Sequence, residues 1–189
     1  MREFIYYSKQ AVTSGKLIQS DLKAAGRMDI VCNVILSAFF ISNKMRDDVK
    51  LHLLFDGPPN APRHLILESN PEMPISKKDM AGLIKRMLYK SPRKKGYLKQ
   101  IYPGCYIENK GFEDVVREIG KKVYVLDEKG EDIRQIKLDG VFVLGDQEGF
   151  PKDKKKFLKS YNKISVGPEI YFASQCLILL NNEIDRQVI

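Results

Sequence analysis

The chain has 189 residues, 43% of them hydrophobic, which suits one domain whose core needs neither disulfides nor metals. Lysine and arginine number 32 against 24 aspartates and glutamates, so the formal net charge is +8. Two histidines, and three cysteines in no zinc-binding spacing, argue against a histidine triad, a metal site or a disulfide framework, and indicate a cytoplasmic protein.

Strands and helices alternate along the first half of the chain, which predicts an α/β fold with an open, mostly parallel sheet. Strands are expected at Arg2–Tyr7, Leu51–Phe55 and Leu65–Leu67, and helices at Arg27–Ser42 and from Met80 to Leu88. Ser76, followed three residues later by Asp79, is expected to cap the second helix, and Pro92 to end it.

The second half continues the alternation. Strands are expected at Tyr106–Glu108, Val123–Leu126, Val141–Leu144 and Ile164–Val166, and helices at Phe112–Ile119 and Tyr171–Asn182. The last three strands are short apolar runs, each followed by a turn with little side-chain bulk. Because ligands of open α/β sheets bind outside the carboxyl ends of the strands, these turns are a candidate binding site.

Two basic clusters point to a nucleic acid as partner. No acidic residue occurs between Met80 and Ile107, a stretch that contains Lys85, Arg86, Lys90, Arg93, Lys94, Lys95 and Lys99. The second cluster comprises Lys152, Lys154, Lys155, Lys156, Lys159 and Lys163. Tyrosines on which bases could stack are interleaved with both. We expect Arg93, Lys94 and Lys95, in a loop over Ser91–Gly104, to contact RNA; the alternative is that the lysines serve solubility alone.

Five motifs, in this order and spacing, resemble the archaeal tRNA pseudouridine N1-methyltransferase family, which acts on position 54 in the T-loop. They are Gly26–Asp29, Gly57–Pro62, Pro103–Gly104, Val143–Asp146, and Ser165–Pro168 leading to Cys176. The resemblance covers essentially the whole chain. It implies one SPOUT-superfamily domain over residues 1–189, with tRNA as partner and a homodimeric state. The N-terminal part would contact RNA, and residues from roughly 120 to 189 would form a trefoil knot that binds S-adenosylmethionine.

The same resemblance assigns cofactor-binding residues. They are Leu126, Gly145, Val166, Gly167, Pro168, Glu169, Ile170 and Cys176. A cysteine on the apolar face of a helix is usually a small core residue. We interpret Cys176 as a wall of the pocket and not as a nucleophile, because N1 of pseudouridine is itself the nucleophile. Asp146 and Glu148 could hold the ribose or ammonium group of the cofactor, or could simply stabilise the turn.

Arg27 and Asp29 are the candidate catalytic residues. Methylation of N1 requires that the N1 proton leave, and negative charge that develops on the uracil ring must be stabilised, so a proton acceptor and a hydrogen-bond donor are needed. The family match makes Asp29 a candidate base or base-orienter, and Arg27 a contact to a phosphate or a base oxygen. The alternative is a helix-start acid that favours the helix dipole, beside a solvent-facing arginine.

Two other functions stay open at the level of sequence. One is a SPOUT methyltransferase with another RNA target, either a ribose 2′-hydroxyl or a ribosomal RNA base. The other is a non-catalytic RNA-binding protein of the same fold. The final helix is apolar on most of its circumference, which independently favours a homodimer. The longest apolar stretches are too short and too interrupted to span a membrane.

Overall fold

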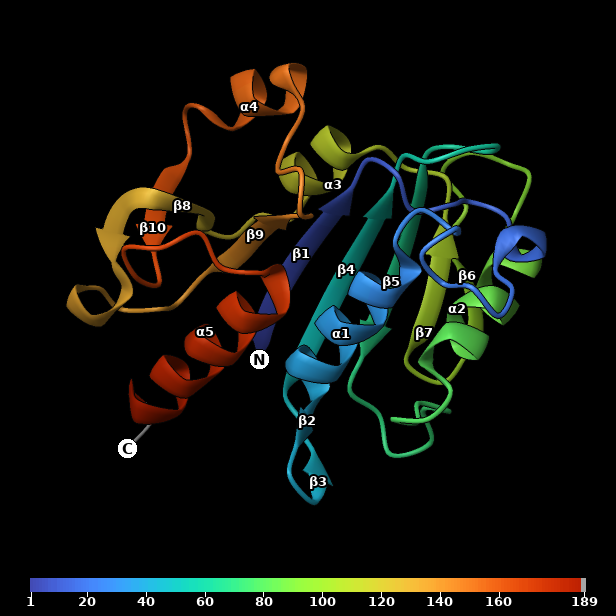
Figure 1. Ribbon diagram of the computed structural model, residues 1–189, viewed down its shortest axis with the longest axis horizontal. Coiled ribbons are helices and arrows are strands. Elements are labelled where there is room, and N and C mark those ends of the chain that lie inside the picture. Colours follow the sequence, from blue (N-terminus) through green and yellow to red (C-terminus); the bar gives the residue numbers. More distant parts are fainter. Residues whose placement is uncertain (188–189) are drawn as a thin grey trace.

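One eight-stranded sheet forms the centre of the computed structural model, which describes residues 1–187 (Figure 1). Its strands are β1 Arg2–Ser8, β4 Val49–Phe55, β5 Arg63–Glu68, β6 Lys99–Tyr102, β7 Cys105–Glu108, β8 Val123–Asp132, β9 Val141–Gly145 and β10 Asn162–Ser165. Their order is β10-β8-β9-β1-β4-β5-β7-β6. The strands from β10 to β4 are mutually parallel, whereas β5, β7 and β6 continue the sheet in antiparallel pairs. The expected mostly parallel α/β sheet is therefore confirmed.

Helices cover both faces of this sheet. One face carries α1 Met28–Phe39, α2 Met80–Tyr89 and α5 Ala173–Gln187, and α5 packs against α1 (Figure 1). The other carries α3 Phe112–Glu118 and α4 Lys152–Leu158. Short 3₁₀ turns occur at η1 Gly15–Leu17 and η2 Ile133–Gln135. Across residues 1–187, none of the helices is long and apolar enough to cross a membrane.

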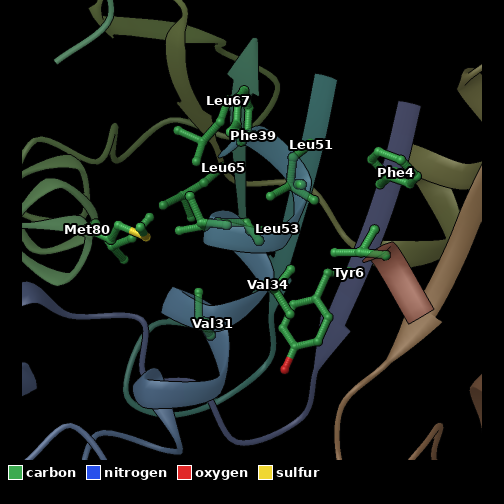
Figure 2. Packing of buried hydrophobic residues seen from close by; sticks show 14 of the residues in the cluster. Phe4, Tyr6, Val31, Val34, Phe39, Leu51, Leu53, Leu65, Leu67 and Met80 are labelled. Carbon is green, nitrogen blue, oxygen red and sulfur yellow. The ribbon is translucent and has the colours of Figure 1, made fainter. Parts of the chain in front are cut away.

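The two faces bury separate hydrophobic clusters. Under α1 and α2, Figure 2 shows Leu51 and Leu53 of β4, with Leu65 and Leu67 of β5, beside Met80. On the opposite face, side chains of β1, β9 and β8 pack against α3 and α4. Phe112 of α3 belongs to this second cluster. Strands that are covered on both faces need apolar residues throughout, which is why β9, with the sequence VFVLG, reads as a continuous apolar run.

Two expectations for the first two helices are wrong, and the final helix, expected over Tyr171–Asn182, runs from Ala173 to Gln187. The helix expected to reach Ser42 ends at Phe39, because the next residues form a small hairpin of β2 Phe40–Ile41 and β3 Lys44–Met45. Ser76 does not cap the second helix: its hydroxyl accepts a hydrogen bond from the backbone N–H of Lys78, and Asp79 occupies the N-cap position without a side-chain cap.

Strand β6 and helix α4 also have no counterpart in the sequence-based expectations. Strand β6 lies within the loop expected over Ser91–Gly104, and it turns back on β7 at Gly104, whose φ of 72° suits glycine. Helix α4 lies within the second lysine cluster. Its only apolar residues are Phe157 and Leu158, too few to produce a helical period. The shortened basic loop therefore spans residues 91–98.

Candidate functional site

A cavity of about 660 Å³ opens at the carboxyl ends of β8, β9 and β10. The turns that follow these strands line it, together with the start of α5. Of the residues expected to bind a cofactor, the lining contains Leu126, Gly145, Val166, Gly167, Glu169, Ile170 and Cys176. Pro168 is exposed and is not among the lining residues. The structure thus brings together all but one of the residues that the sequence motifs grouped.

An irregularity in β8 gives the cavity one of its walls. The pairing of β8 with β10 passes from Val125 opposite Lys163 directly to Glu131 opposite Ile164, so residues 126–130 bulge out of the ladder. Gly130 closes the bulge, since a Cβ atom there would lie 2.4 Å from the backbone nitrogen of Ile164. The bulge presents Leu126 and its neighbours to the cavity, as bulges at binding sites commonly do.

Asp146 fastens the turn after β9 to the end of β1. Its Oδ2 accepts hydrogen bonds from the hydroxyl of Ser8 and the backbone N–H of Lys9, both at 3.1 Å, and its Oδ1 accepts from the backbone N–H of Glu148 at 2.9 Å. Burial raises the pKa of Asp146 above its ordinary value. Because this carboxylate is already occupied by the chain itself, the structure favours its role in shaping the turn.

The chemical character of the cavity fits S-adenosylmethionine. Its volume lies in the range of small-molecule sites, and apolar walls such as Leu144 and Phe150 suit an adenine ring. Carboxylates of Asp127 and Glu169 suit the positive sulfonium and ammonium groups. Asp127, which is ion-paired with Lys163 at 2.7 Å, was not singled out in the sequence, although it directly follows an apolar strand run, the signal that could have found it.

Cys176 lies in the wall of this cavity as a neutral thiol. Burial raises the pKa of its thiol to about 11, so the reactive thiolate is scarce near neutral pH. Its Sγ lies 3.9 Å from the carbonyl oxygen of Tyr171. Both observations agree with a lining role and speak against a nucleophilic one.

Arg27 and Asp29 form a bidentate ion pair at the start of α1. Nε of Arg27 donates to Oδ1 of Asp29 at 3.0 Å, and Nη2 donates to Oδ2 at 2.9 Å. Two residues apart, these side chains would not share one face of a continuous helix. They meet because Arg27 precedes the helix in the left-handed conformation, with φ of 63°. Non-glycine residues with such strain cluster at functional sites. The Arg27 hydrogen bonds lower the pKa of Asp29.

The backbone of Gln10 and Ala11 joins three loops into one edge. A Cβ atom on Gly26 would lie 1.8 Å from the carbonyl oxygen of Gln10, and one on Gly57 would lie 2.3 Å from those of Gln10 and Ala11. Only glycine permits such close approach. The Gln10 side chain also donates to Glu148, next to the cavity. The turn before Arg27, the loop after Gly57 and the cavity turn therefore all contact the segment that contains Gln10 and Ala11.

The basic loop, residues 91–98, projects from this edge. Arg93, Lys94 and Lys95 are all exposed, and within residues 1–187 none of them forms an ion pair. Figure 1 shows α2, which leads into the loop, on the far side of α1 from α5. The loop is thus available to a partner but lies apart from the cavity. In the described part of the chain, no group of three or more histidine, cysteine, aspartate or glutamate side chains could hold a metal ion.

Comparisons with known proteins give concordant matches over the full length. Residues 1–189 match the family model described as "Putative SAM-dependent RNA methyltransferase". The tRNA (pseudouridine(54)-N(1))-methyltransferase of Methanococcoides burtonii is 34% identical, and the alignment covers 100% of this chain and 98% of the relative. The protein of the same name from Pyrococcus abyssi is 32% identical, with 98% of each chain covered.

A solved structure shares the fold. The crystal structure of Archaeoglobus fulgidus Nep1 bound to S-adenosylhomocysteine matches with a TM-score of 0.67. The match covers 98% of this chain and 97% of that one at 15% sequence identity, so it shows a common architecture and nothing about substrate.

Proposed function

The chain belongs to the family of S-adenosylmethionine-dependent RNA methyltransferases, and we propose from this premise that it methylates N1 of the pseudouridine at position 54 of tRNA. The single observation that carries the proposal is the full-length similarity to relatives that bear this name, at 32 to 34% identity in the two described above. The fold is of the SPOUT class, which the architecture shared with Nep1 supports. The trefoil knot expected for the C-terminal third stays a prediction.

We place the cofactor in the cavity at the ends of β8, β9 and β10. S-adenosylmethionine supplies an electrophilic methyl group on a positively charged sulfur. Leu126 and Cys176 would enclose its adenosine part, and Glu169 would compensate its charge. Gly145 and the turn Val166–Ile170 would approach it with their backbone groups. Residues from roughly 120 to 189 would thus bind the cofactor, and the N-terminal part would bind RNA.

For catalysis, we propose that Arg27 contacts the target base and that Asp29 orients the Arg27 guanidinium. Loss of the N1 proton places negative charge on the uracil ring, and a fixed guanidinium can stabilise that charge until N1 attacks the methyl group. Asp29 holds two of the Arg27 donors, and its lowered pKa makes it a weak proton acceptor. The pair therefore suits an electrostatic and orienting role better than general-base chemistry.

tRNA binding would use both basic regions. Arg93, Lys94 and Lys95 are exposed on the basic loop, while Lys155 and Lys159 line the cavity itself. Positive groups at the cavity would hold the phosphates next to the target nucleotide, and the basic loop would hold a more distant part of the tRNA. We propose a cytoplasmic location, where such a substrate is found.

A homodimer would cover an apolar surface on α5 and its flanks. Phe172 and Ile178 are 64% and 56% exposed, and Leu36 of the adjoining α1 is 37% exposed. Exposed apolar groups of this size on adjoining helices are typical of an association surface. Phe172 also lines the cavity, so a second copy seated here would close the cavity on its open side.

The direct test is methylation of defined tRNA. The purified chain, given S-adenosylmethionine and a tRNA transcript with pseudouridine at position 54, should yield N1-methylpseudouridine by nucleoside mass spectrometry. The same transcript with uridine at position 54 should not react, because uridine has no free N1. Cells lacking the gene should lose the modified nucleoside. Methylation of a ribose hydroxyl, or of ribosomal RNA only, would overturn the proposal.

A further inference from the structure

Arg63, which follows the proline-rich loop Gly57–Pro62, has binding capacity that the chain leaves unused. Its Nη1 donates to the carbonyl oxygen of Pro62 at 2.9 Å, while its Nε is buried without a hydrogen-bond acceptor. It forms no ion pair within residues 1–187, although its side chain is partly buried. Burial without a compensating charge lowers the pKa of Arg63. A fixed guanidinium of this kind is suited to an external anion.

Two further unsatisfied polar atoms belong to segments that adjoin Arg63. Strands β5 and β7 pair His64 with Glu108, so Arg63 and Asn109 are the next residues outward on the two strands. The side-chain Nδ2 of Asn109 donates to the carbonyl oxygen of Pro92 at 2.8 Å, but its Oδ1 is buried without a donor. The hydroxyl of Ser91, the residue before Pro92, is also buried without a partner.

The clustering of these atoms is the informative point. Within residues 1–187, Arg63, Ser91 and Asn109 are the only residues with a buried side-chain polar atom that lacks a partner. More than nine in ten buried polar groups in proteins are hydrogen-bonded, so three exceptions on adjoining segments point to a partner from outside the chain. The place is the base of the basic loop, at the edge of the sheet that also carries Arg27.

The mixture of donors and acceptors selects the kind of partner. A phosphate only accepts hydrogen bonds, so it would satisfy the Arg63 guanidinium but leave the Asn109 oxygen unpaired. A ribose 2′-hydroxyl both donates and accepts, and it can pair with the Asn109 oxygen and the Ser91 hydroxyl together. An RNA backbone offers a phosphate and a 2′-hydroxyl on adjacent atoms, which matches the three groups.

We propose that Arg63, Ser91 and Asn109 form a ribonucleotide subsite, which holds the backbone of the substrate RNA between the target base and the basic loop. Arg63 binds a phosphate, and Ser91 and Asn109 bind the neighbouring ribose hydroxyl. The subsite rests on the proposed function in that it takes the substrate to be RNA. It adds a point of discrimination between RNA and DNA that the exposed lysines cannot provide.

Ser91→Ala is the sharpest variant, because it removes a hydroxyl that makes no hydrogen bond in the free protein. Its melting temperature should equal that of the wild type or exceed it, since no internal bond is lost. Its Kd for a T-arm RNA hairpin containing pseudouridine should rise about 3- to 10-fold, the equivalent of one hydrogen bond. Single 2′-deoxy substitutions in the hairpin should weaken wild-type binding at one position, and Ser91→Ala should be insensitive to that substitution.

Arg63→Gln tests the phosphate contact. Its Kd for the same hairpin should rise about 10- to 100-fold, and the slope of log Kd against log salt should fall by about 1. Arg134→Gln is the matched control, because Arg134 is an exposed arginine on η2 and its loss changes the net charge equally. Binding is measured with S-adenosylhomocysteine present, so the readout does not depend on turnover.

Each outcome separates the subsite from the proposed function. If the wild type methylates the hairpin but Ser91→Ala and Arg63→Gln bind it as the wild type does, ordered water alone satisfies these atoms and the subsite is overturned. An equal loss for Arg134→Gln would show a general charge effect, which also overturns it. If the wild type binds RNA with the expected pattern of losses but does not methylate pseudouridine, the subsite stands and the proposed function fails.

Discussion

His52 and His64 are hydrogen-bonded to each other inside the sheet, with 2.8 Å between Nδ1 of His52 and Nε2 of His64. Glu3 of β1 lies 2.8 Å from the other nitrogen of His52, and Glu108 of β7 lies 2.8 Å from the other nitrogen of His64. All four side chains are buried. They form one hydrogen-bonded chain across four neighbouring strands, on the face opposite α1.

The three hydrogen bonds of this chain fix where its protons lie. Burial would raise the pKa of Glu3, but hydrogen bonds from His52 and Lys121 outweigh it and lower the pKa to about 2. The hydrogen bond from His64 likewise lowers the pKa of Glu108. Both carboxylates therefore only accept. Burial lowers the pKa of His64 to about 4, so this ring is neutral and donates its one N–H to Glu108. Nε2 of the neutral His64 ring therefore accepts the hydrogen bond from Nδ1 of His52.

Acidification between pH 7 and pH 5 should destabilise the fold through His64. Its folded pKa of about 4 lies below the unfolded value of 6.5, so the unfolded state binds more protons in this window. The stability that His64 contributes is therefore complete above pH 6.5 and is lost as the pH falls, by about 2 kcal/mol at pH 5. Urea denaturation at pH 7 and pH 5 measures it. His64→Gln should be less stable at pH 7 but nearly insensitive to pH here; a wild type of constant stability would refute the assignment.

Gly145→Val should weaken cofactor binding. A Cβ atom at Gly145 would lie 3.1 Å from the Cα of Gly149 and 3.4 Å from the ring of Phe150, so valine must displace the turn that lines the cavity. We expect Kd for S-adenosylhomocysteine to rise about 5- to 100-fold by titration calorimetry, the usual cost of overpacking. Gly111→Val is the control, since a Cβ there meets only the Asp114 side chain, at 3.8 Å. Equal affinities in both variants would remove Gly145 from the site.

Replacing Arg93, Lys94 and Lys95 together with alanine should weaken tRNA binding and flatten its salt dependence. Each phosphate contact contributes about 0.7 to 0.9 to the slope of log affinity against log salt, so the slope should fall by about 2. The matched control replaces Arg134, Lys137 and Arg186, which are exposed on η2, just after it, and at the end of α5. An unchanged slope in the first variant would exclude the basic loop as a phosphate contact.

Asp29→Asn should reduce turnover more than binding. The asparagine keeps the shape but loses the paired charge that fixes Arg27, and misplacing a catalytic group costs about 10²-fold in rate. We expect kcat for pseudouridine-containing tRNA to fall by that factor while S-adenosylmethionine affinity stays intact. Asp29→Glu should recover part of the rate.

The pH profile separates the two roles of Asp29. If Asp29 orients Arg27, the loss in Asp29→Asn is uniform with pH, because the lowered pKa keeps the wild-type carboxylate ionised throughout the assay range. A loss that varies with pH would restore Asp29 as the proton acceptor. If Asp29→Asn turned over tRNA at the wild-type rate, Asp29 would serve only as the acid at the start of the helix.

Ile178→Glu should convert the proposed homodimer into a monomer. Ile178 is 56% exposed on α5, so a glutamate there is harmless in the free chain but would be buried without a partner in an apolar interface. Sedimentation equilibrium should show the wild type at twice the 21.7 kDa chain mass and the variant at that mass. Leu17→Glu, at a 46% exposed position on η1, should stay dimeric. A monomeric wild type at micromolar concentration would refute the homodimer.

The sequence was informative wherever a local pattern determines the structure. Apolar runs such as Val141–Leu144 predict buried strands, and the glycine-containing turns after them predict where a cavity opens, because carboxyl ends of parallel strands meet at one edge. The motif around Arg27 was likewise visible. Most residues of the cavity are therefore predictable from short segments of the sequence.

The sequence was silent where partners are far apart along the chain. His64 has no acidic neighbour in sequence, and Glu108 reaches it only through the pairing of β5 with β7. The contact between Asn109 and Pro92 depends on the same pairing. The ion pair of Arg27 and Asp29 needed a left-handed residue, which helical periodicity does not signal. Tertiary pairing, not local propensity, decides these features.

The position of β1 has a consequence for how the protein is made. This strand leaves the ribosome before its neighbours, which are separated from it by long stretches of chain: Arg2 pairs with Val49, and Glu3 with Val141. Arg2 is further held by Asp185, at 2.9 Å, near the end of the chain. The nascent chain must therefore keep one edge of β1 unpaired until more than two thirds of it has been synthesised. Such high contact order slows folding, and it leaves an unpaired strand edge that can pair with other chains. The yield of folded protein should therefore depend on chaperones that shield this edge.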